Sequence, residues 1–215
     1  MIEIDAAATR WSVATRERMP LLVLLHGYGA DEHDLFGLVP YLPDAVAVAS
    51  VAAPLSPPWP MPGRSWYPIE GLDGRDPAHV TSAAEAFLRW LDTSAGDAPG
   101  IALLGFSQGA AVSLQAMRLA PERFGAVVAL SGYAVPGDMP LDARLSEVKP
   151  PVFWGRGTND DVIPARLVEH TAEWLPAHSD LSGRVYPGLT HSISEQELTD
   201  VRRFLDRWVD GLPTG

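Results

Sequence analysis

The chain has 215 residues, of which 47% are hydrophobic and 20% charged, with a formal net charge of −11. This size predicts a single domain over residues 1–215, and the acidic balance argues against a nucleic-acid or anionic-membrane surface, which would need concentrated basic residues. The sequence contains no cysteine, which excludes disulfides, thiolate metal sites and a cysteine nucleophile.

The start of the chain, Met1 to Asp5, has neither the basic nor the apolar region of a signal peptide. No apolar run approaches the length of a membrane-spanning helix. We therefore expect a cytoplasmic protein without stable membrane association.

Apolar runs bounded by Gly, Pro and Asp alternate with helical patterns along the chain. This alternation is typical of an α/β protein, in which helices cover both faces of a mostly parallel central sheet. The expected strands are 11–14 at an edge, 21–25, 46–53, 101–104, 126–130, 151–154 and 183–186. The expected helices are 77–93, 110–119, 164–175 and 195–209, with an amphipathic segment at 34–42.

Residues 54–75 contain six prolines and several glycines, which predicts a long structured loop. Long loops in compact domains usually line functional sites. Segments 55–75 and 133–150 are too short for a large lid domain, so we expect an open site.

The segment from Gly105 to Gly109 reads Gly-Phe-Ser-Gln-Gly and joins an expected strand to an expected helix. A G-x-S-x-G sequence in this setting indicates a sharp turn that exposes a nucleophilic serine. Gly105 and Gly109 stand where a β-carbon would collide with neighbouring chain. Ser107 is therefore the candidate nucleophile, the alternative being a serine that only caps a helix.

A general base and an acid should follow Ser107 on loops at the carboxyl ends of later strands. His191 follows the last expected strand, and histidine is the residue type best suited to proton transfer near neutral pH. Asp160 and Asp161 are adjacent candidates for the carboxylate that orients this histidine. Spacing alone does not separate them.

The developing oxyanion needs two backbone N–H donors. The architecture supplies one from the residue after the nucleophile, Gln108, and one from an early strand-to-helix loop. The loop His26-Gly27-Tyr28-Gly29 follows the expected strand 21–25, and Tyr28 is the candidate donor through its main chain. We expect His26, at a strand end, to be packed and hydrogen-bonded and not a second base.

Together these segments resemble the phospholipase/carboxylesterase family, which includes small carboxylesterases and acyl-protein thioesterases. The resemblance rests on five segments that span most of the chain: Leu-His-Gly-Tyr-Gly-Ala-Asp-Glu at 25–32, Ser-Trp-Tyr at 65–67, Gly-Phe-Ser-Gln-Gly-Ala at 105–110, Gly-Thr-Asn-Asp-Asp-Val-Ile-Pro at 157–164 and Tyr-Pro-Gly-Leu-Thr-His-Ser-Ile at 186–193. It implies an α/β-hydrolase fold and assigns the acid to Asp160 and the oxyanion donors to Tyr28 and Gln108. Arg156 stands where the family often has a histidine, and Tyr28 where it often has leucine.

Apolar residues of segments 55–75 and 133–150, together with Val162, could receive an acyl chain. Our substrate-binding candidates are Trp66, Tyr67, Met139 and Val162. Loop packing is the alternative for each of them. An open site with such a surface favours short or medium-chain esters.

The sequence thus predicts a serine carboxylesterase that works through an acyl-enzyme. A thioesterase or lysophospholipase with the same triad is the alternative, and a non-catalytic ligand-binding protein of this fold is a more distant one. The expected partner is a small ester, with no nucleic acid, and a homodimer is left open. The six histidines show no paired ligand spacing, so we expect no metal and no cofactor.

Overall fold

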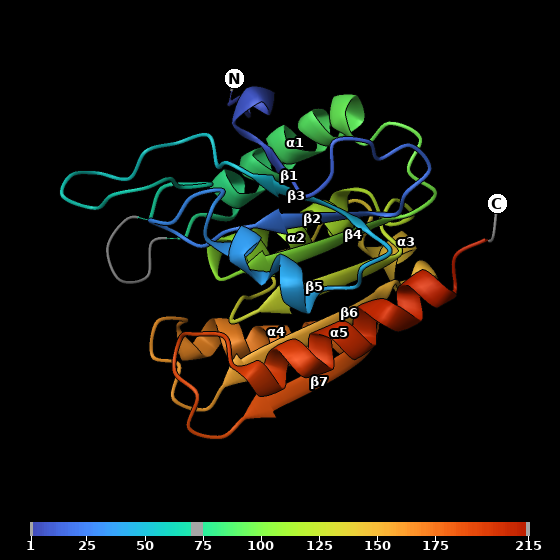
Figure 1. Ribbon diagram of the computed structural model, residues 1–215. Coiled ribbons are helices and arrows are strands. Elements are labelled where there is room, and N and C mark those ends of the chain that lie inside the picture. Colours follow the sequence, from blue (N-terminus) through green and yellow to red (C-terminus); the bar gives the residue numbers. More distant parts are fainter. Residues whose placement is uncertain (1, 70–74, 214–215) are drawn as a thin grey trace.

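The computed structural model describes residues 2–69 and 75–213. Seven strands form one sheet in the order β1-β3-β2-β4-β5-β6-β7 (Figure 1). β1 pairs with β3 in antiparallel orientation, and every other neighbouring pair is parallel. The strands are β1 (Arg10–Trp11), β2 (Leu21–Leu25), β3 (Ala47–Val51), β4 (Ile101–Phe106), β5 (Ala126–Leu130), β6 (Pro151–Gly157) and β7 (Asp180–Tyr186).

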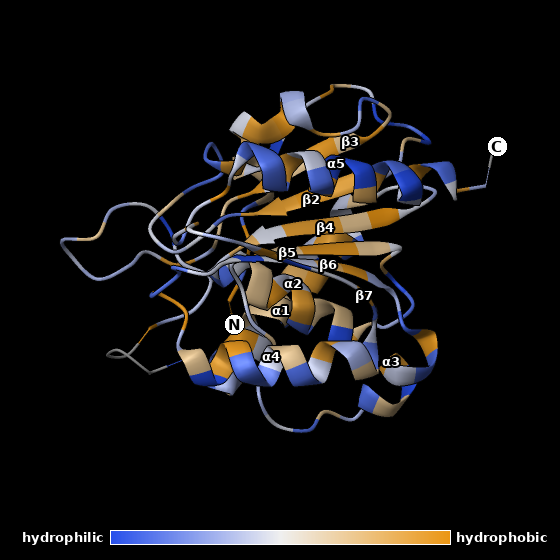
Figure 2. Cartoon of the chain, turned by 90° about the horizontal axis from the view of Figure 1, so that it is seen from below, coloured by the Kyte–Doolittle hydropathy of each residue, from blue (hydrophilic) through white to orange (hydrophobic). Residues whose placement is uncertain are grey.

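Helices cover both faces of this sheet, as Figure 2 shows with α5 on one side and α1, α2 and α4 on the other. The helices are η1 (Ala6–Ala8), η2 (Leu35–Tyr41), α1 (Pro77–Ser94), α2 (Gln108–Leu119), α3 (Asp142–Val148), α4 (Ala165–His178) and α5 (Glu195–Asp210). The predicted α/β class, with a mostly parallel sheet between two helical layers, is confirmed. The described residues form no large separate domain.

Alternate residues of each central strand enter two separate cores. Val23 and Leu103 pack with α1 and α2 on one face, whereas Leu24 and Leu104 pack with η2 and α5 on the other. Both faces of the sheet are buried, so β2 and β5 are apolar along their whole length, β3 is apolar except for the buried Ser50, and none of the three alternates with exposed polar residues.

Two elements differ from the prediction because polar side chains accept backbone N–H groups at their ends. The edge strand is only Arg10–Trp11 and not 11–14, because the Ser12 hydroxyl accepts the N–H of Val48 and so replaces a backbone acceptor. The short helix α3, which the sequence did not indicate, begins where Asp142 accepts the Met139 N–H and pairs with the buried Arg118.

Other boundaries shift because of pairing and turn geometry. Segment 34–42 forms the 3-10 helix η2, which contains Pro40. β6 continues to Gly157 and β7 begins at Asp180, since these two strands pair along their full length.

The predicted long loop returns to the carboxyl end of β2. The backbones of Arg64 and Gly29–Ala30 exchange hydrogen bonds of 2.9 and 2.8 Å, and Leu55 pairs with Ser65. Residues 70–74 of this loop lie outside the described residues. The described part therefore lies beside the end of the strand that leads to the candidate oxyanion loop.

Across residues 2–69 and 75–213, no helix combines the length and the apolar character that crossing a membrane requires.

A buried carboxyl group lies between α5 and the sheet. Glu197 is 0% exposed, and neither of its side-chain oxygens has a hydrogen-bond partner among the described residues. A β-carbon on Gly155 of β6 would collide with its Oε1, so the carboxyl lies directly against the strand. Burial, aided by the charge of Asp200 and only partly offset by the Ser194 backbone, raises the pKa of Glu197 to about 7.

We predict that Glu197→Gln removes part of the pH dependence of folding stability. Between pH 4.5 and 7 the folded state holds a proton on Glu197 that the unfolded state releases, so wild-type stability falls as pH rises through this range. At about 1.4 kcal/mol per pKa unit, the effect approaches 3 kcal/mol. Urea unfolding should show that the variant gains stability relative to wild type at pH 8 compared with pH 4.5.

The matched control is Glu195→Gln, because Glu195 is exposed in the first turn of the same helix. The control should shift stability little at either pH. An equal effect of Glu197→Gln at both pH values would contradict the prediction.

Candidate active site

Ser107 forms the turn between β4 and α2. Its backbone has φ 54° and ψ −114°, a combination that residues other than glycine rarely adopt. A β-carbon on Gly105 would collide with the Gly109 backbone, and one on Gly109 would collide with the Leu25 and His26 carbonyls. The expected reason for both glycines is thus confirmed, and the strained turn presents the serine hydroxyl at the carboxyl end of the sheet.

His191 and Asp160 extend a hydrogen-bonded chain from this serine. The Ser107 hydroxyl lies 2.8 Å from Nε2 of His191, and Nδ1 of the same ring lies 2.8 Å from Oδ2 of Asp160. A carboxylate only accepts, so Nδ1 carries the proton and Nε2 is left to accept the serine proton. The three residues come from the ends of β4, β6 and β7, which are parallel and therefore end at the same edge of the sheet.

The geometry of the turn after β6 distinguishes between the two candidate carboxylates, Asp160 and Asp161. Oδ1 of Asp160 accepts the backbone N–H groups of Val162 and Ile163 at 3.0 and 3.3 Å, which leaves Oδ2 directed to His191. Partial burial opposes ionisation of this group, but the hydrogen bonds from His191 and the turn outweigh it and hold the pKa of Asp160 below its usual range. Asp161 is exposed and does not contact His191.

Two backbone N–H groups are available beside the nucleophile. Tyr28 and Gln108 both line the cavity that contains Ser107 and His191, and neither backbone N–H donates to another residue in the described part of the chain. The Gln108 N–H is also at the start of α2, where the helix dipole favours negative charge. A β-carbon on Gly27 would be 3.1 Å from the Phe106 ring, so a larger residue here would require the ring to move by a few tenths of an ångström.

The side chain of Gln108 binds the long loop, a role that sequence reasoning missed. Its Oε1 accepts the Trp66 backbone N–H at 2.7 Å, and its Nε2 donates to the Tyr67 carbonyl at 2.7 Å and the Ser65 hydroxyl at 3.2 Å. One amide thereby fixes three consecutive residues. The sequence feature that could have indicated this contact is the presence of both Ser-Trp-Tyr at 65–67 and Phe-Ser-Gln at 106–108 in one chain.

Trp66 and His26 hold the candidate oxyanion loop from behind. The Trp66 indole N–H donates to the His26 carbonyl at 2.8 Å, and the His26 ring donates from Nδ1 to the Gly27 carbonyl and accepts from Ala53 at Nε2. His26 is fully buried, and burial lowers its pKa. The expected packed role of His26 is confirmed.

The cavity beside Ser107 has a volume of about 220 Å³. Of the four substrate-binding candidates, Tyr67 and Val162 line it. Trp66 does not, because its ring is fully buried and its N–H is used by the His26 carbonyl. Met139 also lies outside the lining, since its backbone is held by Asp142 at the start of α3.

Several lining residues were not selected from the sequence as substrate-binding. Among them are Arg75, Tyr133 and Ile163. Tyr133 comes from the end of β5, which carries no motif, and only the fold brings it to Ser107. Arg75 ends the long loop, and its guanidinium donates to the Val162 carbonyl at 3.1 Å.

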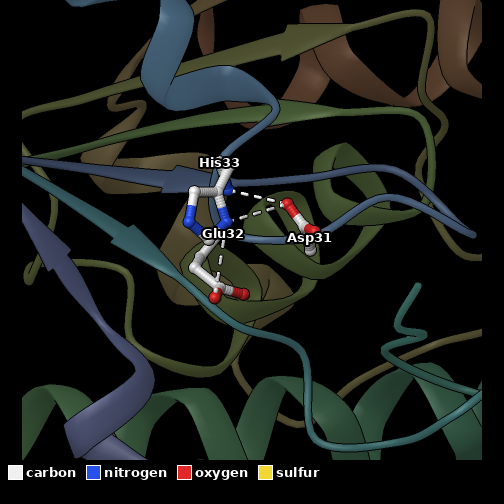
Figure 3. A group of neighbouring side chains, drawn as sticks. All are labelled: Asp31, Glu32 and His33. Atoms are coloured by element: carbon white, nitrogen blue, oxygen red, sulfur yellow. Dashed lines mark hydrogen bonds and ion pairs between the residues drawn. The ribbon is translucent and has the colours of Figure 1, made fainter.

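Asp31, Glu32 and His33 form a small cluster on the loop after β2 (Figure 3), with candidate ligand atoms within 4.8 Å of one another. His33 pairs with Asp31 at 3.3 Å and with Glu32 at 3.5 Å, and Arg64 lies 3.8 Å from Glu32. These ion pairs account for the arrangement, and we assign it no metal.

Comparison with known proteins gives one consistent family. A family model described as phospholipase/carboxylesterase matches residues 12–209. Acyl-protein thioesterase 1 of Debaryomyces hansenii is 37% identical over 105 residues, which cover 47% of this chain and 45% of that protein. Acyl-protein thioesterase 1 of Cryptococcus neoformans is 28% identical over 216 residues, covering 86% and 90%. The chain thus spans about half the length of the first of these relatives and most of the second.

The crystal structure of esterase PE8 has a TM-score of 0.78 and 28% sequence identity, covering 96% of this chain and 99% of that one. The similarity therefore extends over the whole sheet and both helical layers.

We predict that Asp160→Asn lowers kcat for p-nitrophenyl acetate by roughly 10³- to 10⁴-fold, because the amide no longer holds His191 in the tautomer that accepts the serine proton. Asp161→Asn is the matched control and should stay near wild-type activity, since Asp161 is exposed. Equal losses in both variants would show that Asp160 does not act through His191.

We predict that Trp66→Phe lowers kcat about tenfold with little change in KM, because the candidate oxyanion loop loses the hydrogen bond to its His26 carbonyl. Trp90→Phe is the control, since Trp90 is also buried but its indole N–H has no partner among the described residues. Steady-state kinetics of both variants, with circular dichroism to verify folding, make the comparison. A change confined to KM would contradict the positioning role.

Proposed function

The chain belongs to the phospholipase/carboxylesterase family, and we propose that it is a serine carboxylesterase that hydrolyses short to medium-chain esters through an acyl-enzyme. The observation that carries this proposal is the hydrogen-bonded chain from Ser107 through His191 to Asp160, with both distances at 2.8 Å. The hydrolase fold and the esterase-type family of the chain support it independently.

In the proposed first step, Ser107 attacks the ester carbonyl while His191 takes its proton at Nε2. Asp160 keeps Nδ1 protonated and stabilises the imidazolium that forms. The backbone N–H groups of Tyr28 and Gln108 stabilise the oxyanion of the tetrahedral intermediate, because they are held in place before the reaction begins. The intermediate collapses when His191 returns the proton to the alcohol oxygen, and the alcohol leaves.

In the second step, a water molecule attacks the acyl-enzyme with His191 again as the base. The same two N–H groups stabilise the second tetrahedral intermediate, and its collapse releases the acid and restores the Ser107 hydroxyl. The Phe106 ring lies 4.9 Å from the His191 ring and limits the movement of the imidazole. The proposed chemistry uses this chain's own residues throughout.

The size of the cavity supports a short or medium acyl group. A volume of about 220 Å³ lies below the roughly 300 to 1,000 Å³ that is typical of pockets for larger ligands. A long fatty-acyl chain would have to extend out of this space.

A thioesterase is the second candidate, because the two relatives described above are named acyl-protein thioesterases. The same triad would serve, with a thiol as the leaving group. Lysophospholipase activity is a further variant within the family. The cytoplasmic location expected from the sequence, and a small ester as the partner, are parts of the proposal.

We predict that a fluorophosphonate probe labels the wild-type protein and that Ser107→Ala abolishes labelling and lowers ester hydrolysis by roughly 10⁵- to 10⁶-fold. The control is Ser131→Ala: this serine ends the neighbouring strand, is buried and also has a positive φ of 46°. The control should keep both labelling and activity. Well-folded wild-type protein that does not react would favour a non-catalytic ligand-binding protein.

A panel of p-nitrophenyl esters with acyl chains of increasing length, each with a matched thioester, tests the substrate class. We expect kcat/KM to peak at a short or medium chain and to fall for long chains, because the cavity is small. Thioester rates that consistently exceed those of the oxyesters, after correction for intrinsic reactivity, would favour the thioesterase.

A further inference from the structure

Two tyrosines meet in the wall of the catalytic cavity. Tyr67 belongs to the loop that Gln108 fixes, and Tyr133 follows β5, so the fold joins two distant segments here. Their hydroxyl oxygens are 2.7 Å apart, and the residues are 1% and 2% exposed. Both line the cavity that contains Ser107. The proposed hydrolysis uses neither of them.

A count of protons shows that this pair has one donor to spare. Burial raises the pKa of both phenols, so both carry their proton near neutral pH. One proton forms the hydrogen bond between the two oxygens, and neither hydroxyl has another hydrogen-bond partner in the described part of the chain. A buried O–H that lacks an acceptor costs free energy, which a bound acceptor would recover.

The surroundings of the pair add a positive charge. The Arg75 guanidinium lies 5.9 Å from the centre of the Tyr133 ring and donates to the Val162 carbonyl in the same cavity. Asp34, which is exposed, is the other charged residue among those that line the cavity beside the triad. The wall therefore offers buried hydroxyl donors and the half-buried guanidinium of Arg75, which suit an oxygen atom better than a methylene group.

We infer that the acyl group of the preferred ester carries an acceptor oxygen beyond its carbonyl, and that the Tyr67–Tyr133 hydroxyl pair binds this oxygen. The inference rests on the proposed esterase function and deepens it by naming a substrate class. The acyl group becomes bonded to Ser107 in the first step and stays there until water releases it in the second, so it is the part of the substrate that this cavity must accommodate. A ketone, ether or carboxylate oxygen meets the same requirement.

The test compares esters that differ in one position of the acyl chain. The pair p-nitrophenyl 4-oxopentanoate and p-nitrophenyl pentanoate replaces a methylene by a carbonyl at equal chain length. The glutarate monoester, compared with the hexanoate, supplies a carboxylate in place of the terminal ethyl group. Each kcat/KM is divided by the rate of alkaline hydrolysis, so that intrinsic reactivity is removed.

We expect wild-type protein to prefer an oxygen-bearing ester by about tenfold, a typical value for one buried hydrogen bond. In the double variant Tyr67→Phe/Tyr133→Phe the ratio of the two normalised rates should fall to about one, because no hydroxyl is left to favour the oxygen-bearing ester. A larger preference for the glutarate monoester that Arg75→Gln removes would identify the oxygen as a carboxylate. A larger preference for the oxopentanoate would identify it as neutral.

Equal normalised rates on both members of each pair would overturn the inference and leave the esterase proposal intact. A second experiment tests the inference in case the esterase proposal fails. Methyl 4-oxopentanoate and methyl pentanoate are titrated into Ser107→Ala, and binding is followed by NMR. Tighter binding of the oxo ester, lost with the added Tyr67→Phe/Tyr133→Phe change, supports the hydroxyl site even if no ester is hydrolysed. Equal binding of the two methyl esters would overturn it.

Discussion

The site depends on a close backbone contact between the start of α2 and the end of β2. At Gly109 the helix lies against the carbonyls of Leu25 and His26, where any β-carbon would collide. This contact brings the first N–H of α2 and the loop after β2 to the same side of Ser107. The two candidate oxyanion donors thus converge because two secondary structure elements are packed backbone to backbone, and the strained φ of Ser107 is a consequence of the same approach.

Buried polar groups hold this arrangement. The Gln108 amide, the Trp66 indole and the His26 ring each find partners in the loops around the nucleophile. In a water-free interior such a network is rigid, because breaking any one bond leaves an unsatisfied group. Glu197 behind the sheet shows the contrast: its buried carboxyl lacks such partners, and its pKa rises to about 7.

The volume and the lining of the cavity connect this scaffold with the choice of substrate. The family and the proposed triad point to a class of chemistry, whereas the volume of about 220 Å³ and the tyrosine pair are the features proposed to distinguish among esters of that class. The proposed preference for a short acyl group that carries an oxygen arises from two side chains outside the catalytic motifs. Both are placed by loops, which vary more readily than the elements that carry Ser107 and His191.

The sequence by itself determined the features that depend on local order. Apolar strands between helical patterns predicted a sheet covered on both faces, and the glycines at 105 and 109 predicted a crowded turn. Only the structure showed that the chain crowded against Gly109 is the end of β2 at Leu25 and His26. Spacing alone did not choose between Asp160 and Asp161. That choice rested on the family resemblance, and in the structure it depends on which carboxylate the Val162 and Ile163 N–H groups orient. Only the tertiary structure decided that Trp66 faces the core and Tyr133 the cavity. The identity of a residue does not specify which distant segment will pack against its side chain.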